Sequence, residues 1–230
     1  MSVSSSVQSA AGMRFRDRAH AGRVLARALL AYAGRDDVVV LALPRGGVPV
    51  AAELARALGV HLDVFVVRKL GLPGHEELAM GAVAPGGVLV LDDRLVRGLG
   101  ISDEVLQETV EKELRELERR EAAYRAGRPP LDLEGKTVIL VDDGLATGAT
   151  MRAAALALRK YKPARVVVAV PVASAETCDE FRADVDEIVC ALTPSPFHAV
   201  GLWHDDFPQT GDEEVRELLR DSSDDEETAG

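Results

Sequence analysis

The chain is poor in cysteine and aromatic residues and has no long hydrophobic run. Its two cysteines, Cys178 and Cys190, fall in helix- and strand-like patterns rather than at the close spacing of metal ligands. We therefore expect reduced, half-buried thiols and a cytoplasmic protein. No apolar stretch approaches the roughly 20 residues that span a bilayer, and the first residues lack the charged start and apolar core of a secretory signal. These absences argue against a membrane-bound or secreted protein.

Positive charge is also scarce, since 38 acidic residues face 27 basic ones and the formal net charge is −11. This balance would repel a phosphate backbone except at a local basic patch, which argues against nucleic acid as a partner. Residues 221–230 are acidic and contain no large apolar residue, so we expect a disordered tail. Residues 1–12 are rich in Ser and Ala and are expected to form a disordered leader. One domain over 13–220 accounts for the rest.

Residues 138–151, reading VILVDDGLATGATM, are the most informative stretch. A β-branched, apolar run ends at two adjacent carboxylates, Asp142 and Asp143, and a loop of small residues then opens a helix. Ligands of parallel sheets bind at the carboxyl ends of the strands. There the two carboxylates could accept hydrogen bonds from a cis-diol and face a hydrated magnesium ion. Backbone N–H groups and hydroxyls of residues 144–150 could wrap a phosphate. The layout suits a ribose together with its phosphate.

A strand, an acidic turn and an ordinary helix cap would share parts of this pattern, since Thr147 or Thr150 can cap a helix without any ligand. The stretch has no Gly-Lys-Ser/Thr of a Walker loop and no Gly-x-Gly-x-x-Gly of a dinucleotide site. As a whole it resembles the 5-phosphoribosyl-1-pyrophosphate (PRPP) motif of type I phosphoribosyltransferases. The resemblance implies magnesium as cofactor beside Asp142 and Asp143, and PRPP binding by Asp142, Asp143, Gly144, Leu145, Ala146, Thr147, Gly148, Ala149 and Thr150.

The remaining pattern predicts an α/β fold with a doubly wound, mostly parallel sheet flanked by helices. We expect helices over 17–33, 48–58, 102–126, 151–161, 176–181 and 212–219. We expect strands over 38–43, 61–67, 138–141, 164–170 and 187–192, and a hairpin made by 80–84 and 88–91. The resemblance implies the type I phosphoribosyltransferase fold with a small C-terminal hood over 193–210, and residues 92–130 are predicted to be a long helical insertion.

Two basic segments could bind the pyrophosphate of PRPP. Arg45 follows the first strand and could grip phosphate oxygens, while Gly46 and Gly47 let the main chain approach; in the family this loop often carries a strained or cis peptide. Alone, Arg-Gly-Gly is a common strand-to-helix turn. Arg68 and Lys69 follow the next strand and could bind the pyrophosphate in the same way. A pair of solvated basic side chains without a ligand is an equally good interpretation. The resemblance implies pyrophosphate binding by Arg45, Gly46, Gly47 and Arg68, and catalytic roles for Arg45 and Lys69.

A lid and a hood could cover the site. The glycine-rich segment 71–87 is the candidate lid, from which Glu77 is predicted to act in catalysis, although exposed glutamates are more often surface charge. Residues 193–210 are rich in Pro and aromatic residues. There the family places a hood that stacks on the acceptor, which implies acceptor binding by Phe197, Trp203 and Phe207. The alternative is a hydrophobic plug over the sheet edge.

The implied reaction is transfer of the 5-phosphoribosyl group from PRPP to a nucleobase or related nitrogen acceptor with release of pyrophosphate. Ala146 stands where members acting on 6-oxopurines carry an acid, which disfavours hypoxanthine and guanine. A PRPP- or nucleotide-sensing regulator without catalysis is the alternative. A phosphohydrolase with an aspartyl nucleophile would need Asp-x-Asp rather than adjacent acids. Related domains often dimerise, so a homodimer is a further expectation.

Overall fold

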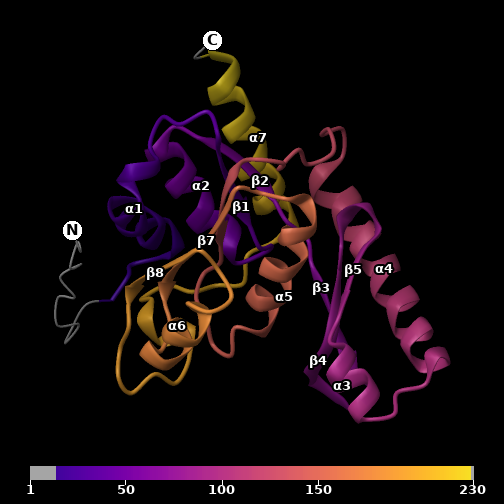
Figure 1. The fold of residues 1–230 in the computed structure, drawn as a ribbon. Helices are drawn as coiled ribbons and strands as arrows, with labels where there is room; N and C mark the ends of the chain where they lie inside the picture. Colours follow the sequence, from indigo (N-terminus) through magenta and orange to yellow (C-terminus); the bar gives the residue numbers. More distant parts are fainter. Residues whose placement is uncertain (1–13, 229–230) are drawn as a thin grey trace.

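The structure is a computed structural model that describes residues 14–228, so the expected leader lies outside the described residues. A five-stranded sheet in the order β2-β1-β6-β7-β8 forms its centre, and every pairing in it is parallel (Figure 1). Its strands are β1 (Val38–Ala42), β2 (His61–Val64), β6 (Thr137–Val141), β7 (Arg165–Val172) and β8 (Glu187–Leu192). Strands β1 and β6 are buried along their whole length, as their apolar, β-branched sequences predict.

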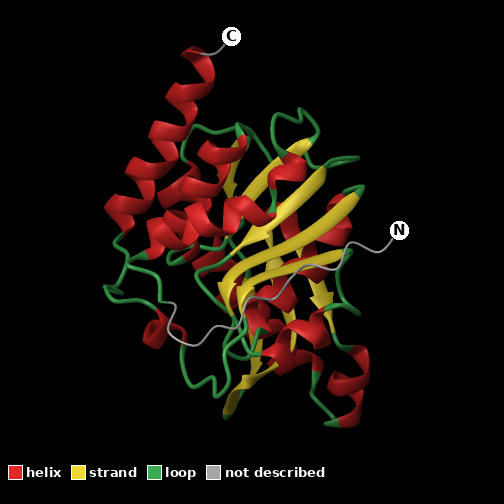
Figure 2. Cartoon of the chain, turned by 90° about the vertical axis from the view of Figure 1, so that its left-hand side faces the viewer, coloured by secondary structure: helices red, strands yellow, loops and turns green. Residues whose placement is uncertain are grey.

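Helices cover both faces of this sheet, which confirms the doubly wound fold (Figure 2). Alternate residues along each central strand point to opposite faces: Val40 and Ile139 pack with α1, α2 and α7, whereas Leu41 and Leu140 pack with α5 and α6. The helices are α1 (Arg18–Ala28), α2 (Gly47–Leu58), α5 (Ala149–Leu158), α6 (Ala175–Phe181) and α7 (Asp212–Thr228). Four 3₁₀ turns occur among the described residues: η1 (Leu30–Tyr32), η2 (Pro85–Gly87), η3 (Arg159–Tyr161) and η4 (Val200–Trp203).

A second, antiparallel sheet of three strands lies beside the main one, with the helical insertion packed against it (Figure 1). It consists of β3 (Arg68–Leu72), β4 (His75–Ala84) and β5 (Val88–Leu91), and the chain continues into α3 (Asp93–Gly98) and α4 (Asp103–Arg125). The side chain of Ser102 caps α4. The expected strand over 61–67 was too long, because β2 stops at Val64 and the basic pair begins β3 instead. The candidate lid 71–87 contains the β3–β4 turn and the whole of β4, so much of it is strand rather than loop.

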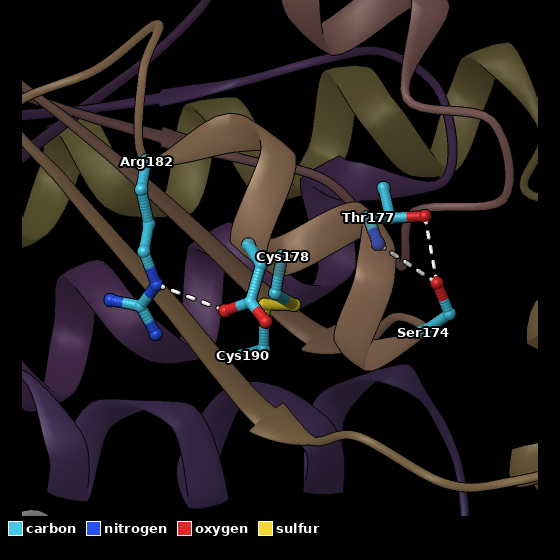
Figure 3. The surroundings of a disulfide bond; sticks show 6 residues. Ser174, Thr177, Cys178, Arg182 and Cys190 are labelled. Carbon is cyan, nitrogen blue, oxygen red and sulfur yellow. Dashed lines mark hydrogen bonds and ion pairs between the residues drawn. A yellow bond between two sulfur atoms is a disulfide. The ribbon is translucent and has the colours of Figure 1, made fainter.

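Two further expectations were wrong. Cys178 and Cys190 form a disulfide, because α6 packs beside β8 and brings the two sulfur atoms together (Figure 3). The C-terminal helix also continues to Thr228, so residues 221–228 are helical where we expected a disordered tail. No glycine or proline interrupts 212–228, and acidic residues are compatible with a helix once its preceding turns are anchored. None of the helices in the described part is both long and apolar enough to cross a bilayer.

Candidate functional site

The candidate site lies where the strand order of the main sheet reverses. Strand β1 has β2 on one side and β6 on the other, so the chain leaves the carboxyl ends of β1 and β6 at a topological switch point. Ligands of open α/β sheets bind in the crevice outside such a point. The two departing loops are joined directly, since Leu43 N donates to Val141 O over 2.8 Å. The fold therefore brings together residues 45–47, predicted to bind pyrophosphate, and residues 142–150, predicted to bind the ribose and its phosphate.

Glycine is required where these two loops touch. A Cβ atom on Gly46 would lie 2.1 Å from Oδ2 of Asp143, and one on Gly47 would lie 2.9 Å from Cα of Asp142. Any larger residue would displace the paired acids. The peptide bond between Pro44 and Arg45 is cis, as the family resemblance led us to expect. The Arg-Gly-Gly turn therefore packs directly against the acidic pair, and this contact requires glycine at both positions.

Each of the two carboxylates has one oxygen held and one oxygen open. Asp143 N donates to Oδ1 of Asp142 over 2.8 Å. Oδ2 of Asp143 accepts from Nε of Arg18 over 2.8 Å, and Nη2 of the same guanidinium lies 2.8 Å from that oxygen as an ion pair. Within residues 14–228, no protein donor contacts Asp142 Oδ2 or Asp143 Oδ1. Burial, followed by the charge of Asp143, raises the pKa of Asp142 well above its usual range. Two open acceptors remain for hydroxyls or a hydrated cation.

The loop after the acids forms a small phosphate-sized hollow at the start of α5. The hollow has a volume of about 140 Å³ and is lined by Asp142 and by residues 144–151. Leu145 N donates to Val172 O over 2.9 Å, which ties the loop to the end of β7. Gly148 has φ of 69° and precedes α5, and Ala149 N makes only a long contact of 3.5 Å with Thr147 Oγ1, so the start of the helix lines the hollow. The backbone N–H donors of a helix start and the helix dipole favour an anion there.

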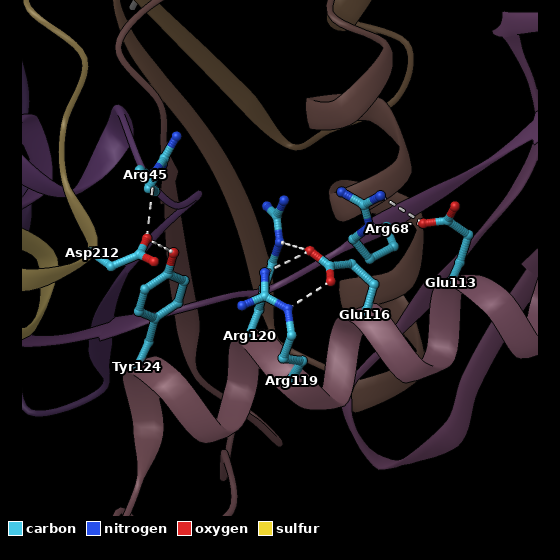
Figure 4. Close-up of polar contacts among 8 residues, drawn as sticks. All are labelled: Arg45, Arg68, Glu113, Glu116, Arg119, Arg120, Tyr124 and Asp212. Carbon is cyan, nitrogen blue, oxygen red and sulfur yellow. Dashed lines mark hydrogen bonds and ion pairs between the residues drawn. The ribbon is translucent and has the colours of Figure 1, made fainter.

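The two arginines predicted to bind pyrophosphate are both paired with carboxylates (Figure 4). Arg45 Nη1 lies 3.5 Å from Oδ1 of Asp212, which also accepts from the Tyr124 hydroxyl over 2.7 Å. Arg68 donates from Nε to Oε2 of Glu113 over 2.8 Å, and its Nη2 forms an ion pair with the same oxygen at 2.7 Å. Burial and the neighbouring carboxylate raise the pKa of Tyr124 to about 12. Helices α4 and α7 thus neutralise the basic residues that flank the acidic pair.

The other two residues predicted for catalysis lie in the second sheet. Lys69 is the second residue of β3 and pairs in register with Ala82 of β4. Glu77 belongs to β4. Their catalytic roles stay predictions.

The three aromatic residues predicted to bind the acceptor are each half-buried. Phe197 and Trp203 pack against a small apolar cluster that includes Phe15 and Val172. The guanidinium carbon of Arg18 lies 3.6 Å from the ring centroid of Phe207. Within the described part of the chain, the buried Nε1 of Trp203 has no hydrogen-bond partner. This packing is compatible with both the hood and the hydrophobic plug, and the acceptor-binding roles of Phe197, Trp203 and Phe207 stay predictions.

The sequence pattern alone did not predict that the N-terminal segment lies beside the hood. Phe15 N donates to Trp203 O, and Asp205 N donates back to Phe15 O, over 2.9 and 2.8 Å. Arg18 reaches the acidic pair from 125 residues away in sequence. The only local signal was Asp17, which caps α1 and sets where Arg18 lies.

A magnesium ion would fit the acidic pair with help from a substrate. Among the described residues, no three His, Cys, Asp or Glu side chains gather into a ready-made metal cage. Magnesium commonly binds through one or two carboxylates and completes its shell with water and substrate phosphates. The two open oxygens of Asp142 and Asp143 match that mode.

Comparisons with known proteins agree with this geometry. Residues 16–206 match a family model described as phosphoribosyl transferase domain. The chain is 46% identical over 205 residues to Rv0571c of Mycobacterium tuberculosis, whose name gives phosphoribosyl transferase as a provisional assignment; the match covers 89% of this chain and 46% of that protein. The chain thus spans about half the length of that relative. It is 32% identical over 154 residues to the bifunctional protein PyrR of Roseiflexus, covering 66% of this chain and 64% of PyrR.

A solved structure shows the same fold over nearly the whole chain. The crystal structure of TT1426 from Thermus thermophilus superposes with a TM-score of 0.82 at 47% sequence identity, and the alignment covers 91% of this chain and 99% of TT1426. The arrangement of the two sheets and the insertion is therefore shared with a solved protein.

Proposed function

The chain belongs to the phosphoribosyl transferase domain family, and on this premise we propose that it transfers the 5-phosphoribosyl group of PRPP to a nitrogen acceptor and releases pyrophosphate. The observation that carries the proposal is the acidic pair with one open oxygen on each carboxylate, set beside the hollow at the start of α5. This juxtaposition supports a ribose 5-phosphate, since the diol and the phosphate find their partners on one continuous loop.

In the proposed complex, Asp142 and Asp143 accept hydrogen bonds from the ribose hydroxyls, and the 144–150 loop holds the 5-phosphate. Gly46 and Gly47 let the main chain approach the pyrophosphate. Asp142 and Asp143, together with the ligand, would hold a magnesium ion, which would supply positive charge near the departing pyrophosphate.

Bond breaking at the anomeric carbon passes through an oxocarbenium-like state, as in glycoside hydrolysis. The bond to pyrophosphate breaks with its electron pair leaving on the pyrophosphate oxygen, and the lone pair of the acceptor nitrogen forms the new bond. Arg45 stabilises the departing charge once its side chain leaves Asp212. We propose that Lys69 and Arg68, at the start of β3, add positive charge that stabilises the departing pyrophosphate. Glu77 is proposed to take the proton of the acceptor.

The acceptor is proposed to lie under the hood, near Phe197, Trp203 and Phe207. Ala146 is exposed at the edge of the loop and cannot pair with the exocyclic groups of a 6-oxopurine, so we propose that the acceptor belongs to another class.

Pyrophosphate release tests the proposal. The protein is incubated with PRPP, magnesium and single acceptors chosen from nucleobases and small amines, and a coupled assay reports pyrophosphate. We expect release with at least one acceptor and its loss on combining Asp142→Asn with Asp143→Asn. The control is Asp37→Asn, an exposed acid paired with Arg35 far from the site.

A PRPP-sensing regulator without catalysis is the second candidate. It is favoured by the pairing of Arg45 with Asp212 and of Arg68 with Glu113, because these carboxylates neutralise the charge that a departing pyrophosphate needs. Tight binding of PRPP with no pyrophosphate release across the acceptor panel would select this alternative over the enzyme.

A further inference from the structure

Arg18 lies between the acidic pair and the hood. It is the first residue of α1, and its place is fixed by the Asp17 side chain, which accepts from His20 N over 2.6 Å. The Arg18 guanidinium donates from Nε to Oδ2 of Asp143 over 2.8 Å, and its Nη2 forms an ion pair with the same oxygen at 2.8 Å. The two side chains are only 11% and 17% exposed, so solvent screens this pair less than an ordinary surface ion pair.

The rest of the same guanidinium holds the hood. Nη1 of Arg18 donates to Pro208 O over 2.6 Å, and the guanidinium carbon lies 3.6 Å from the centroid of the Phe207 ring. The stacked plane and the bond to Pro208 fix the segment that follows η4. One side chain therefore connects α1, the acidic pair and the hood, three parts that are far apart in sequence.

The contact determines which oxygen of Asp143 can meet a ligand. Oδ2 is occupied twice by Arg18, and Gly46 packs so closely that its added Cβ would lie 2.1 Å from the same atom. Rotation of the carboxylate would break the hydrogen bond and the ion pair with Arg18. Among the described residues no protein donor contacts Oδ1, which leaves this oxygen for a ligand. The open geometry of the pair thus depends on a residue outside the PRPP motif.

We propose that Arg18 is a positioning residue that presents Oδ1 of Asp143 to the ribose of PRPP and couples ribose binding to the placement of the hood. The inference rests on the proposed function, because it assigns the ribose to the acidic pair. It adds a residue, and a link between donor site and acceptor site, that the PRPP motif itself does not contain. Phe207 then has one ring face covered by Arg18, and the His204 ring packs against it at a centroid distance of 4.7 Å.

Amide hydrogen exchange and PRPP affinity together test this role. The variants are Arg18→Gln, which removes the charge and the forked bonds, and Arg18→Lys, which keeps the charge. The matched control is Arg23→Gln on the same helix, whose partner Glu53 lies away from the site. Calorimetry measures the affinity for magnesium PRPP, and exchange is followed at Asp205 and Asp206, whose N–H groups donate to Phe15 O and Arg16 O at 2.8 Å.

We expect PRPP to slow exchange of these hood amides in the wild type and in Arg23→Gln, but not in Arg18→Gln. We expect PRPP affinity to fall at least about tenfold in Arg18→Gln, with Arg18→Lys in between, since hydrogen bonds to a charged group are lost. If Arg18→Gln fails to fold, Arg18→Lys provides the same readouts. Wild-type affinity or a wild-type exchange response in the folded variants would overturn the proposal. Failure of the wild type itself to bind PRPP would instead overturn the proposed function.

Discussion

Replacing Gly148 with alanine should cost more than the same change at Gly34, although both glycines have nearly the same backbone conformation. Their φ values are 69° and 66°. A side chain in this left-handed region costs roughly 1–2 kcal/mol. At Gly34 nothing lies within 4 Å of the added Cβ, so only this conformational cost applies. At Gly148 the added Cβ would lie 2.5 Å from Cε2 of Phe181 and 3.0 Å from its Cζ.

The ring of Phe181 is buried and stacked on Arg152, so it has little room to withdraw. Overpacking of this kind adds about 1–3 kcal/mol. We therefore expect Gly148→Ala to destabilise the fold by about 2–5 kcal/mol and Gly34→Ala by about 1–2 kcal/mol. Urea unfolding of the two variants measures the difference.

The two changes should also differ in ligand binding. Gly148 precedes the first N–H groups of α5, so a shifted main chain there should weaken PRPP binding, whereas Gly34→Ala should leave it unchanged. Equal unfolding costs for the two variants, or wild-type PRPP affinity in Gly148→Ala, would refute the claim that Phe181 and Gly148 together shape the phosphate loop.

Three further outcomes follow from the contacts. The disulfide between Cys178 and Cys190 closes a loop with a separation of 12 residues; replacing both by serine should cost about 3 kcal/mol and lower Tm by roughly 6–12 °C, and an unchanged Tm would count against the bond. Burial lowers the pKa of His204, so its contribution to stability is present above its unfolded pKa of about 6.5 and is lost as pH falls through the lower folded pKa; Tm measured from pH 8 to 5 should drop less in His204→Gln. Arg68→Gln and Glu113→Gln should show a coupling free energy of about 1 kcal/mol in a double-mutant cycle followed by urea unfolding, and additive effects would mean that the pair is not formed in solution.

The main sheet and the acidic loop could be predicted because their signals are local. The run before Asp142 is apolar and β-branched, and the structure places β6 there, one residue longer than expected at its start. Gly59 ends α2 in the left-handed conformation, as its place after the apolar pattern indicated. These features depend on residues within a few positions of one another.

Other features depend on contacts between distant segments. The apolar run that begins at His61 looks continuous, yet β2 leaves the main sheet after Val64, and β3 pairs with β4 in a different sheet. Strand membership is decided by those pairings, which periodicity does not reveal. Arg18 is an ordinary basic residue in an amphipathic helix until the fold places it against Asp143. Such residues lack any signature in the local sequence.

The most direct measurement is the affinity for PRPP, by titration calorimetry with magnesium present, of the wild type and of the variant combining Asp142→Asn with Asp143→Asn. Unliganded Tm values confirm that both are folded. We predict saturable binding by the wild type and at least a hundredfold loss of PRPP affinity in the variant. The two substitutions change the carboxylate oxygens that are proposed to bind both the ribose hydroxyls and the cation. A folded variant that binds PRPP as tightly as the wild type would contradict this prediction.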